Sequence, residues 1–169
     1  METYKVTVSK YHTKWYNSKD ELHRVGGPAI EFANGNKEWY KEHKLHREDG
    51  PACEDANGTK YWFVEGKLHR ENGPAIERDD GAKEWHKDGN LHREDGPAIE
   101  CSNGDKHWFI EGNLHREDGP AIEHANGSKH WYLEYVEYTE AEYHKKLQVP
   151  SCEGKVVEID SKKYKLTGA

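Results

Sequence analysis

The sequence is poor in apolar residues, since 33% of its 169 residues are hydrophobic and 34% are charged. So few apolar groups exclude a thick globular core, and no run of them is long enough to cross a membrane. This composition is often a sign of disorder, but six Trp and ten Tyr supply large areas for burial. We therefore expect an ordered chain whose apolar residues recur at regular positions.

The chain also lacks a basic excess, with a formal charge of −7 and a pI near 5.9. This balance argues against general nucleic-acid binding and against adhesion to anionic membranes. The N-terminus, Met1 to Lys5, shows no signal peptide or lipidation motif. Cys53, Cys101 and Cys152 are an odd set without metal-type spacing. We expect a soluble, cytoplasmic protein without membrane insertion.

What the sequence has is a repeat. The stretch Leu91 to Glu100 reads Leu-His-Arg-Glu-Asp-Gly-Pro-Ala-Ile-Glu, and close copies begin at Leu22, Leu45, Leu68 and Leu114, 23 residues apart. A fixed period of this length predicts an array in which each unit buries its apolar face against its neighbours.

Each unit is predicted to be a β-hairpin, because an Asn-Gly or Asp-Gly pair separates its two apolar runs. A two-residue turn at this pair places the Ile row opposite the Trp row. The expected pairs are Ile30 with Trp39, Cys53 with Trp62, Ile76 with Trp85, Ile99 with Trp108, and Ile122 with Trp131. On the other face the expected pairs are Ala29 with Tyr40, Ala52 with Phe63, Ala75 with His86, Ala98 with Phe109, and Ala121 with Tyr132.

The expected fold is all-β, a single-layer meandering sheet with a cap at each end. Residues 1–21 form a half-buried capping strand and a degenerate repeat, 22–136 form five hairpin repeats, and 137–169 form a C-terminal cap. In that cap, Thr139 and Glu142 form a capping box that starts a helix ending near Gln148, before Pro150. A last hairpin turns at Asp160-Ser161 and helps to close the sheet. We expect a monomer or weak dimer.

The 23-residue unit, with its aromatic strand, Asn-Gly turn and Gly-Lys-Leu-His return loop, resembles the MORN repeat from about Leu22 to Tyr132. It is similar to the His-Arg-Glu-Asp-Gly-Pro-Ala variant found in uncharacterised proteins of large phages and large DNA viruses. The resemblance implies an elongated sheet used as a scaffold or protein-binding surface, here in the host cytoplasm. Gly96-Pro97-Ala98 and its equivalents replace the commoner glycine pair.

Three rows are candidates for binding. The Trp row is a stacking platform or an inter-unit core, and the Arg row is a set of clamps on carboxylates or carbonyls or an anion site. Two further rows carry a different residue in most units and become histidine toward the C-terminal end of the array. This histidine-rich end is the third candidate, because its surface could respond to pH. The candidate residues are Trp39, Trp62, Trp85, Trp108, Trp131, Arg47, Arg70, Arg93, Arg116, His107, His124 and His130.

No catalytic constellation is recognisable, because no unit carries one distinct acid, base or nucleophile. We expect no enzyme activity and no cofactor. A metal site is not expected either, because the repeated histidines, from His23 to His115, lie about 10 Å apart in successive hairpins; each is expected to bond a loop carbonyl or carboxylate. Two functions stay open: a scaffold binding a protein partner, such as a host defence protein, and a small-anion or nucleotide binder using the Arg and Trp rows.

Overall fold

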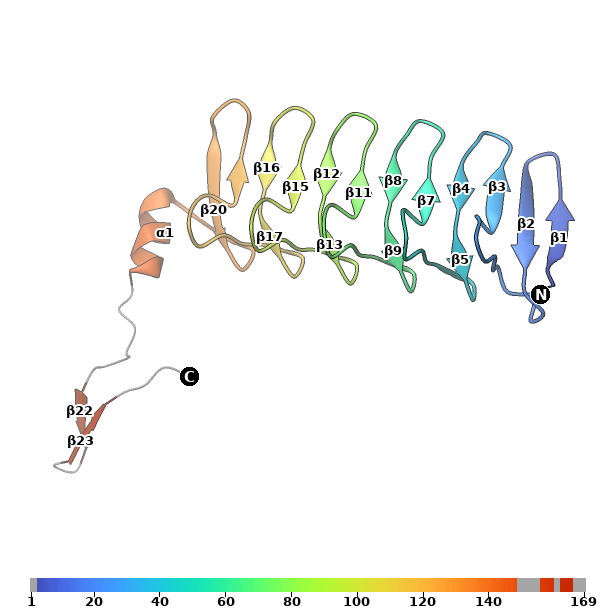
Figure 1. Ribbon diagram of the computed structural model, residues 1–169. Coiled ribbons are helices and arrows are strands. Elements are labelled where there is room, and N and C mark those ends of the chain that lie inside the picture. Colours follow the sequence, from blue (N-terminus) through green and yellow to red (C-terminus); the bar gives the residue numbers. More distant parts are fainter. Residues whose placement is uncertain (1–2, 149–155, 160–161, 166–169) are drawn as a thin grey trace.

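The computed structural model describes residues 3–148, 156–159 and 162–165. Its main element is one antiparallel sheet of 13 strands, whose hairpins stand side by side in a row (Figure 1). The strands are β1 (Lys5–Val8), β2 (His12–Tyr16), β3 (Ile30–Phe32), β4 (Lys37–Glu38), β7 (Cys53–Glu54), β8 (Lys60–Tyr61), β11 (Ile76–Glu77), β12 (Lys83–Glu84), β15 (Ile99–Glu100), β16 (Lys106–His107), β19 (Ile122–Glu123), β20 (Lys129–Leu133) and β21 (Val136–Tyr138). The all-β, single-layer meandering sheet is therefore confirmed.

The turn at each Asn-Gly or Asp-Gly pair differs from the prediction. In the second unit Asp55 N–H donates to Thr59 O and Gly58 N–H donates to Asp55 O, both at 2.9 Å, so the loop contains three residues. Only its glycine has a positive φ, +101° at Gly58, which fits a type I turn followed by a glycine bulge. Asn57 Oδ1 accepts the N–H of Thr59 at 3.0 Å, which explains the preference for Asn or Asp there.

The extra loop residue shifts the register by one, so the predicted Ile–Trp and Ala–aromatic pairs are wrong. The observed partners are Ile30 with Glu38, Cys53 with Tyr61, Ile76 with Glu84, Ile99 with His107, and Ile122 with His130. Because side chains alternate along a strand, the Ile and Trp rows lie on opposite faces of the sheet. The Trp face also carries the fully buried Ala29, Ala52, Ala75, Ala98 and Ala121; the Ile face, which also carries the rows that differ between units, is called the variable face below.

The return turns, at the opposite end of each hairpin, are the two-residue ones. Glu65 and Gly66 have φ values of +49° and +81°, as a type I′ turn requires. In the first and last of these turns His43 and Tyr135 adopt the second position without glycine, at +67° and +70°. The first four of these turns close the two-stranded ladders β5 (Tyr40–Lys41) with β6 (Lys44–Leu45), β9 (Phe63–Val64) with β10 (Lys67–Leu68), β13 (His86–Lys87) with β14 (Asn90–Leu91), and β17 (Phe109–Ile110) with β18 (Asn113–Leu114); the last turn joins β20 to β21.

The expected N-terminal strand, β1, and the segment that carries Trp15, β2, pair as a sixth hairpin. Trp15 N–H donates to Ala29 O at 2.9 Å, as Trp39 N–H does to Ala52 O at 2.8 Å, so Trp15 occupies a regular Trp position. Trp15 lies seven residues before Leu22, one more than Trp39 before Leu45. The additional residue lies in a loop in which Asp20 has a φ of +59°. The predicted half-burial of β1 is wrong: all its residues are exposed, because no other strand of the described residues lies on its outer side.

The C-terminal end is capped by α1 (Glu140–Leu147), which begins at the predicted capping box and contacts β20 and β21. Thr139 N–H donates to Glu142 Oε2 at 3.0 Å, and Glu142 N–H donates to Thr139 Oγ1 at 3.3 Å. Tyr143 is 1% exposed but Leu147 is 41% exposed, so only the tyrosine packs inward. In the described part of the chain no helix is long and apolar enough to cross a membrane.

The last hairpin, β22 (Val156–Ile159) with β23 (Lys162–Lys165), is also present. It forms a separate two-stranded sheet. Its strands therefore do not pair with the edge of the 13-stranded sheet, as they would if they capped it by strand pairing. The predicted turn at Asp160-Ser161, as well as Pro150 and Cys152, lies outside the described residues.

Candidate binding surfaces

The Trp and Arg rows are in contact with each other. The Cζ atom of Arg93 lies 3.9 Å from the centre of the Trp85 ring, in cation–π geometry. Each arginine stacks on the tryptophan of the preceding unit, so the contact joins neighbouring units. The other pairs are Arg24 on Trp15, Arg47 on Trp39, Arg70 on Trp62, and Arg116 on Trp108, at 3.9 to 4.2 Å.

Two of the three guanidinium nitrogens of Arg93 donate hydrogen bonds within the array. Its Nη1 donates to Pro97 O at 3.2 Å and to Glu100 Oε1 at 3.1 Å, and its Nε donates to Asp95 Oδ1 at 2.9 Å. The bonds to the proline carbonyl and the glutamate recur at Arg24, Arg47, Arg70 and Arg116. The predicted contacts with carboxylates and carbonyls are thus present, although the clamp gains a tryptophan face that the sequence did not reveal.

The glycine of the Gly-Pro step is explained by the same arginine. A Cβ atom on Gly96 would lie 2.9 Å from Arg93 Cζ, and the equivalent distances in the other units are 2.9 to 3.2 Å. Any side chain here would push the guanidinium off the tryptophan. This requirement, and not a special φ, fixes Gly96, and sequence reasoning missed it.

The repeated histidines bond to the backbone of the next unit. Glu111 N–H donates to His92 Nδ1 at 3.2 Å, and the same bond recurs at His23, His46, His69 and His115. The proton therefore sits on Nε2, which faces Glu94 Oε1 at 3.5 Å. Of the two expected partners, the carboxylate is present at Nε2, whereas the carbonyl is not found at Nδ1, which accepts from a backbone amide. Among the described residues no group of three or more His, Cys, Asp or Glu is arranged to hold a metal ion.

The Glu and Lys rows of the Trp face alternate across the sheet, with Glu77 opposite both Lys60 and Lys83. Within the described residues no Glu–Lys pair of these rows comes within 4.0 Å, and each glutamate bonds an arginine instead, as Glu77 Oε1 bonds Arg70 Nη1 at 2.8 Å. The lysines are exposed.

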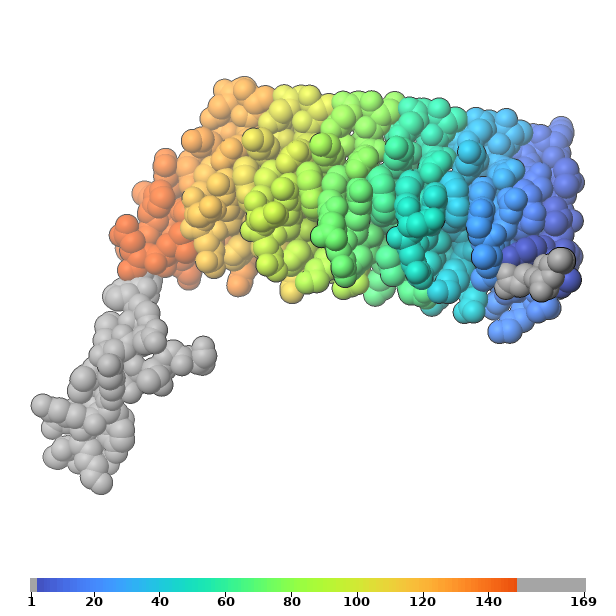
Figure 2. Space-filling view, viewed as in Figure 1, coloured from blue at the N-terminus to red at the C-terminus, as the bar shows by residue number. Residues whose placement is uncertain are grey.

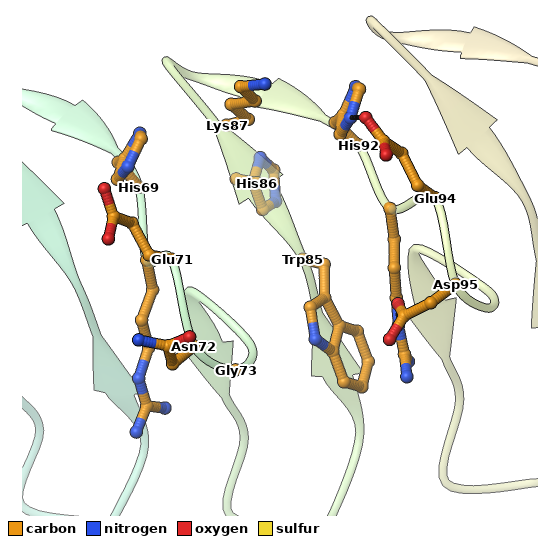
Figure 3. A pocket seen from close by; sticks show the side chains of 12 residues that line it. His69, Glu71, Asn72, Gly73, Trp85, His86, Lys87, His92, Glu94 and Asp95 are labelled. Carbon is orange, nitrogen blue, oxygen red and sulfur yellow. Dashed lines mark hydrogen bonds and ion pairs between the residues drawn. The ribbon is translucent and has the colours of Figure 1, made fainter.

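Open grooves separate neighbouring loops on the Trp face. The groove around Trp85 has a volume of about 710 Å³ and lies between the loops that carry Glu71 and Glu94 (Figure 3). Its rim is acidic, with the side chains of Glu94 and Asp95 81% and 85% exposed. Similar grooves lie between the neighbouring loops. Trp131, the last of its row, is followed by Thr139 in place of an arginine, and α1 contacts its strand.

The variable face brings the three candidate histidines together at its C-terminal end. The ring centres of His107 and His124 are 6.2 Å apart, and those of His124 and His130 are 5.5 Å apart, edge to face. His124 Nδ1 lies 2.9 Å from Asp105 Oδ2, and His130 Nδ1 lies 2.9 Å from Glu137 Oε1. Burial and, second, the charge of His124 lower the pKa of His107.

An ionic network occupies the middle of the same face. Glu84 binds His86 Nε2 at 3.1 Å through Oε2 and binds Arg78 through Oε1. The bond from His86, with the bonds and charge of Arg78, lowers the pKa of Glu84 to about 2 against the opposing effect of burial. This carboxylate is therefore ionised throughout the physiological range.

The chain matches no protein-family model and no curated protein sequence. The structure itself shows tandem antiparallel hairpins in one sheet, the architecture that the 23-residue period predicted.

Proposed function

We propose that the protein is a non-catalytic scaffold that binds another protein through its variable face. The observation that supports this is the division between repeated and varied residues. The groups repeated in nearly every unit, on the Trp face and in its loops, bond to each other, whereas the residues that differ between units lie on the opposite face. A repeat scaffold expresses its specificity where its units differ.

The variable face also has suitable chemistry for a protein partner. Half-buried aromatic rings follow one another across the units on this face, and large rigid aromatics lose little entropy on binding. They are Phe32, Tyr40, Tyr61, Phe63, Phe109 and Tyr132. The histidine cluster and the Glu84 network add polar groups at fixed positions along the same surface.

The resemblance to MORN repeats of large phages and DNA viruses supports a finer proposal. The protein would act in the host cytoplasm, where it binds and inhibits a host protein such as a defence factor. The support for this is the His-Arg-Glu-Asp-Gly-Pro-Ala signature.

The test compares capture of host proteins by two variants of the immobilised chain. Tyr61→Ala with Phe63→Ala removes two rings from the variable face, and Lys60→Ala with Lys106→Ala is the matched control on the Trp face. We expect a protein that wild type and control retain and that the aromatic variant loses. Retention by all three would contradict binding through the variable face.

Small-anion or nucleotide binding is the alternative, supported by the Arg- and Trp-lined grooves of Figure 3. A ligand there would compete with the existing Arg93–Trp85 stack. A tight small ligand raises the melting temperature of the isolated protein. A shift with nucleotides or phosphate that disappears in the Arg93→Lys variant would favour this alternative over the scaffold.

A further inference from the structure

The N-terminal edge of the sheet is open. β1 is the outermost strand, and no other strand of the described residues lies on its outer side. Ser9 N–H donates to His12 O at 2.9 Å at the end of the β1–β2 hairpin. Because bonded and non-bonded pairs alternate in an antiparallel ladder, Lys5, Thr7 and Ser9 direct their backbone groups toward β2. The N–H and C=O groups of Val6 and Val8 therefore point outward.

The same two residues expose apolar side chains. Val6 and Val8 are 48% and 76% exposed, and Val6 lies opposite Trp15, on the Trp face. In later units the loop that leads into the first strand lies over this face, as Arg70 Nη1 bonds Glu77 at 2.8 Å, whereas only Thr3 and Tyr4 are described before β1. Natural edge strands are usually protected by proline, a bulge or an unpaired charge. The only charge in β1 is Lys5, which pairs with Asp20 at 2.7 Å.

We propose that this edge pairs with β1 of a second copy of the chain, antiparallel about a two-fold axis at Thr7. In this register Val6 of each copy lies opposite Val8 of the other, and Lys5 lies opposite Ser9. Both valines offer outward backbone groups, so each Val6–Val8 pair exchanges two hydrogen bonds. The sheet then runs continuously through both copies, with Trp15 and the valines in one apolar row.

Other registers fit less well. A shift by one residue opposes Val6 to Thr7, so that an outward-pointing backbone meets an inward-pointing one. A shift by two opposes a valine to Tyr4 or to Lys10 and leaves fewer valine pairs. The Thr7-centred register alone pairs both valines of β1 with a valine, and its central Thr–Thr pair is a favourable cross-strand contact.

The interface is small, so its association is expected to be weak and concentration-dependent. Sedimentation velocity of the full chain, with no residues added before Met1, should show a shift from monomer to dimer as concentration rises. The double variant Val6→Lys, Val8→Lys places like charges opposite each other and should weaken the dimer about tenfold or more. Val64→Lys, an exposed valine in the middle of the array, is the matched control and should dimerise like wild type.

Disulfide formation tests the register. With the native cysteines replaced by alanine, Thr7→Cys should form a covalent dimer on mild oxidation, because residue 7 meets its own copy across the axis. Lys5→Cys lies opposite Ser9 and should stay monomeric. A wild type that is monomeric at every concentration, a dimer unaffected by the double lysine change, or equal cross-linking at positions 5 and 7 would each overturn the proposal.

Discussion

Replacing Arg93 by lysine tests whether the arginine row is structural. Lysine keeps the charge and most of the stem, but it has no planar group to stack on Trp85. The lysine side chain is one bond shorter, so its ammonium cannot occupy the place of Arg93 Nη1, which binds both Pro97 O and Glu100 Oε1, at 3.2 and 3.1 Å. One of these acceptors, both only partly exposed, therefore loses its partner.

The size of the effect follows from these contacts. A hydrogen bond lost at a partly buried group costs about 1 kcal/mol, and the lost stacking costs about 0.5–1 kcal/mol more. The bond to Asp95 adds little, because this carboxylate is 85% exposed. We expect a loss of about 2 kcal/mol in unfolding free energy, or about 4–8 °C in melting temperature for a chain of this length.

Urea unfolding followed by tryptophan fluorescence measures this loss directly. Arg24→Lys is the comparison, since Arg24 stacks on Trp15 and bonds Pro28 O at 3.1 Å but has Val25-Gly26 in place of Glu-Asp. It should cost less, because it lies at the end of the array with fewer units beyond it. Equal stability of wild type and Arg93→Lys, combined with lost binding of a partner or ligand, would refute the structural role and make the row the site.

Four further changes test other contacts. Trp85→Ala should cost about 3 kcal/mol if the ring is inter-unit core, and little loss in thermal unfolding would indicate an exposed platform. Gly96→Ala should cost about 1–3 kcal/mol but nearly nothing in an Arg93→Ala background, as a double-mutant cycle would show. The Tyr143 hydroxyl donates to Arg116 O at 2.8 Å and accepts from Gly119 N–H at 3.1 Å, so Tyr143→Phe should lower stability by about 1 kcal/mol, seen as faster hydrogen exchange in α1. Because the pKa of Glu84 is lowered to about 2, its stabilisation is complete above the unfolded value of about 4.5 and is lost as pH falls toward 2, so Glu84→Gln should flatten acid unfolding in that window.

The sequence was sufficient to predict the sheet, the period and the cap, because glycine turns, strand alternation and a capping box are local signals. The predicted strand register was wrong because of the turn, since an Asn-Gly pair fits both two-residue and three-residue loops. The sequence does contain a feature that distinguishes the two loop lengths. A two-residue turn opposes Glu31 to Glu38 and Glu77 to Glu84, whereas the observed turn opposes every glutamate of the Glu row to a lysine.

The arginine–tryptophan stack could not be predicted in the same way. It depends on the path of the loop from Arg93 to Pro97 over the Trp face, and no periodicity encodes that path. The spacing from Trp85 to Arg93, eight residues and the same in four of the five stacked pairs, fits the contact only after the path of the loop is known. The histidine bonds to the next turn were missed for the same reason, because they join neighbouring units.

The direction of the strands sets how the array responds to a pulling force. The strands run across the long axis of the array (Figure 1), along which the units follow one another in sequence order (Figure 2). The hydrogen bonds between hairpins therefore lie along that axis. Tension applied between the two ends therefore breaks the hydrogen bonds of one pair of hairpins at a time. It does not load the hydrogen bonds of many pairs together in shear. Each Arg–Trp stack joins two neighbouring hairpins and therefore resists their separation under tension. An array of this kind is expected to unfold one unit at a time under tension, and each unfolding event releases one 23-residue repeat.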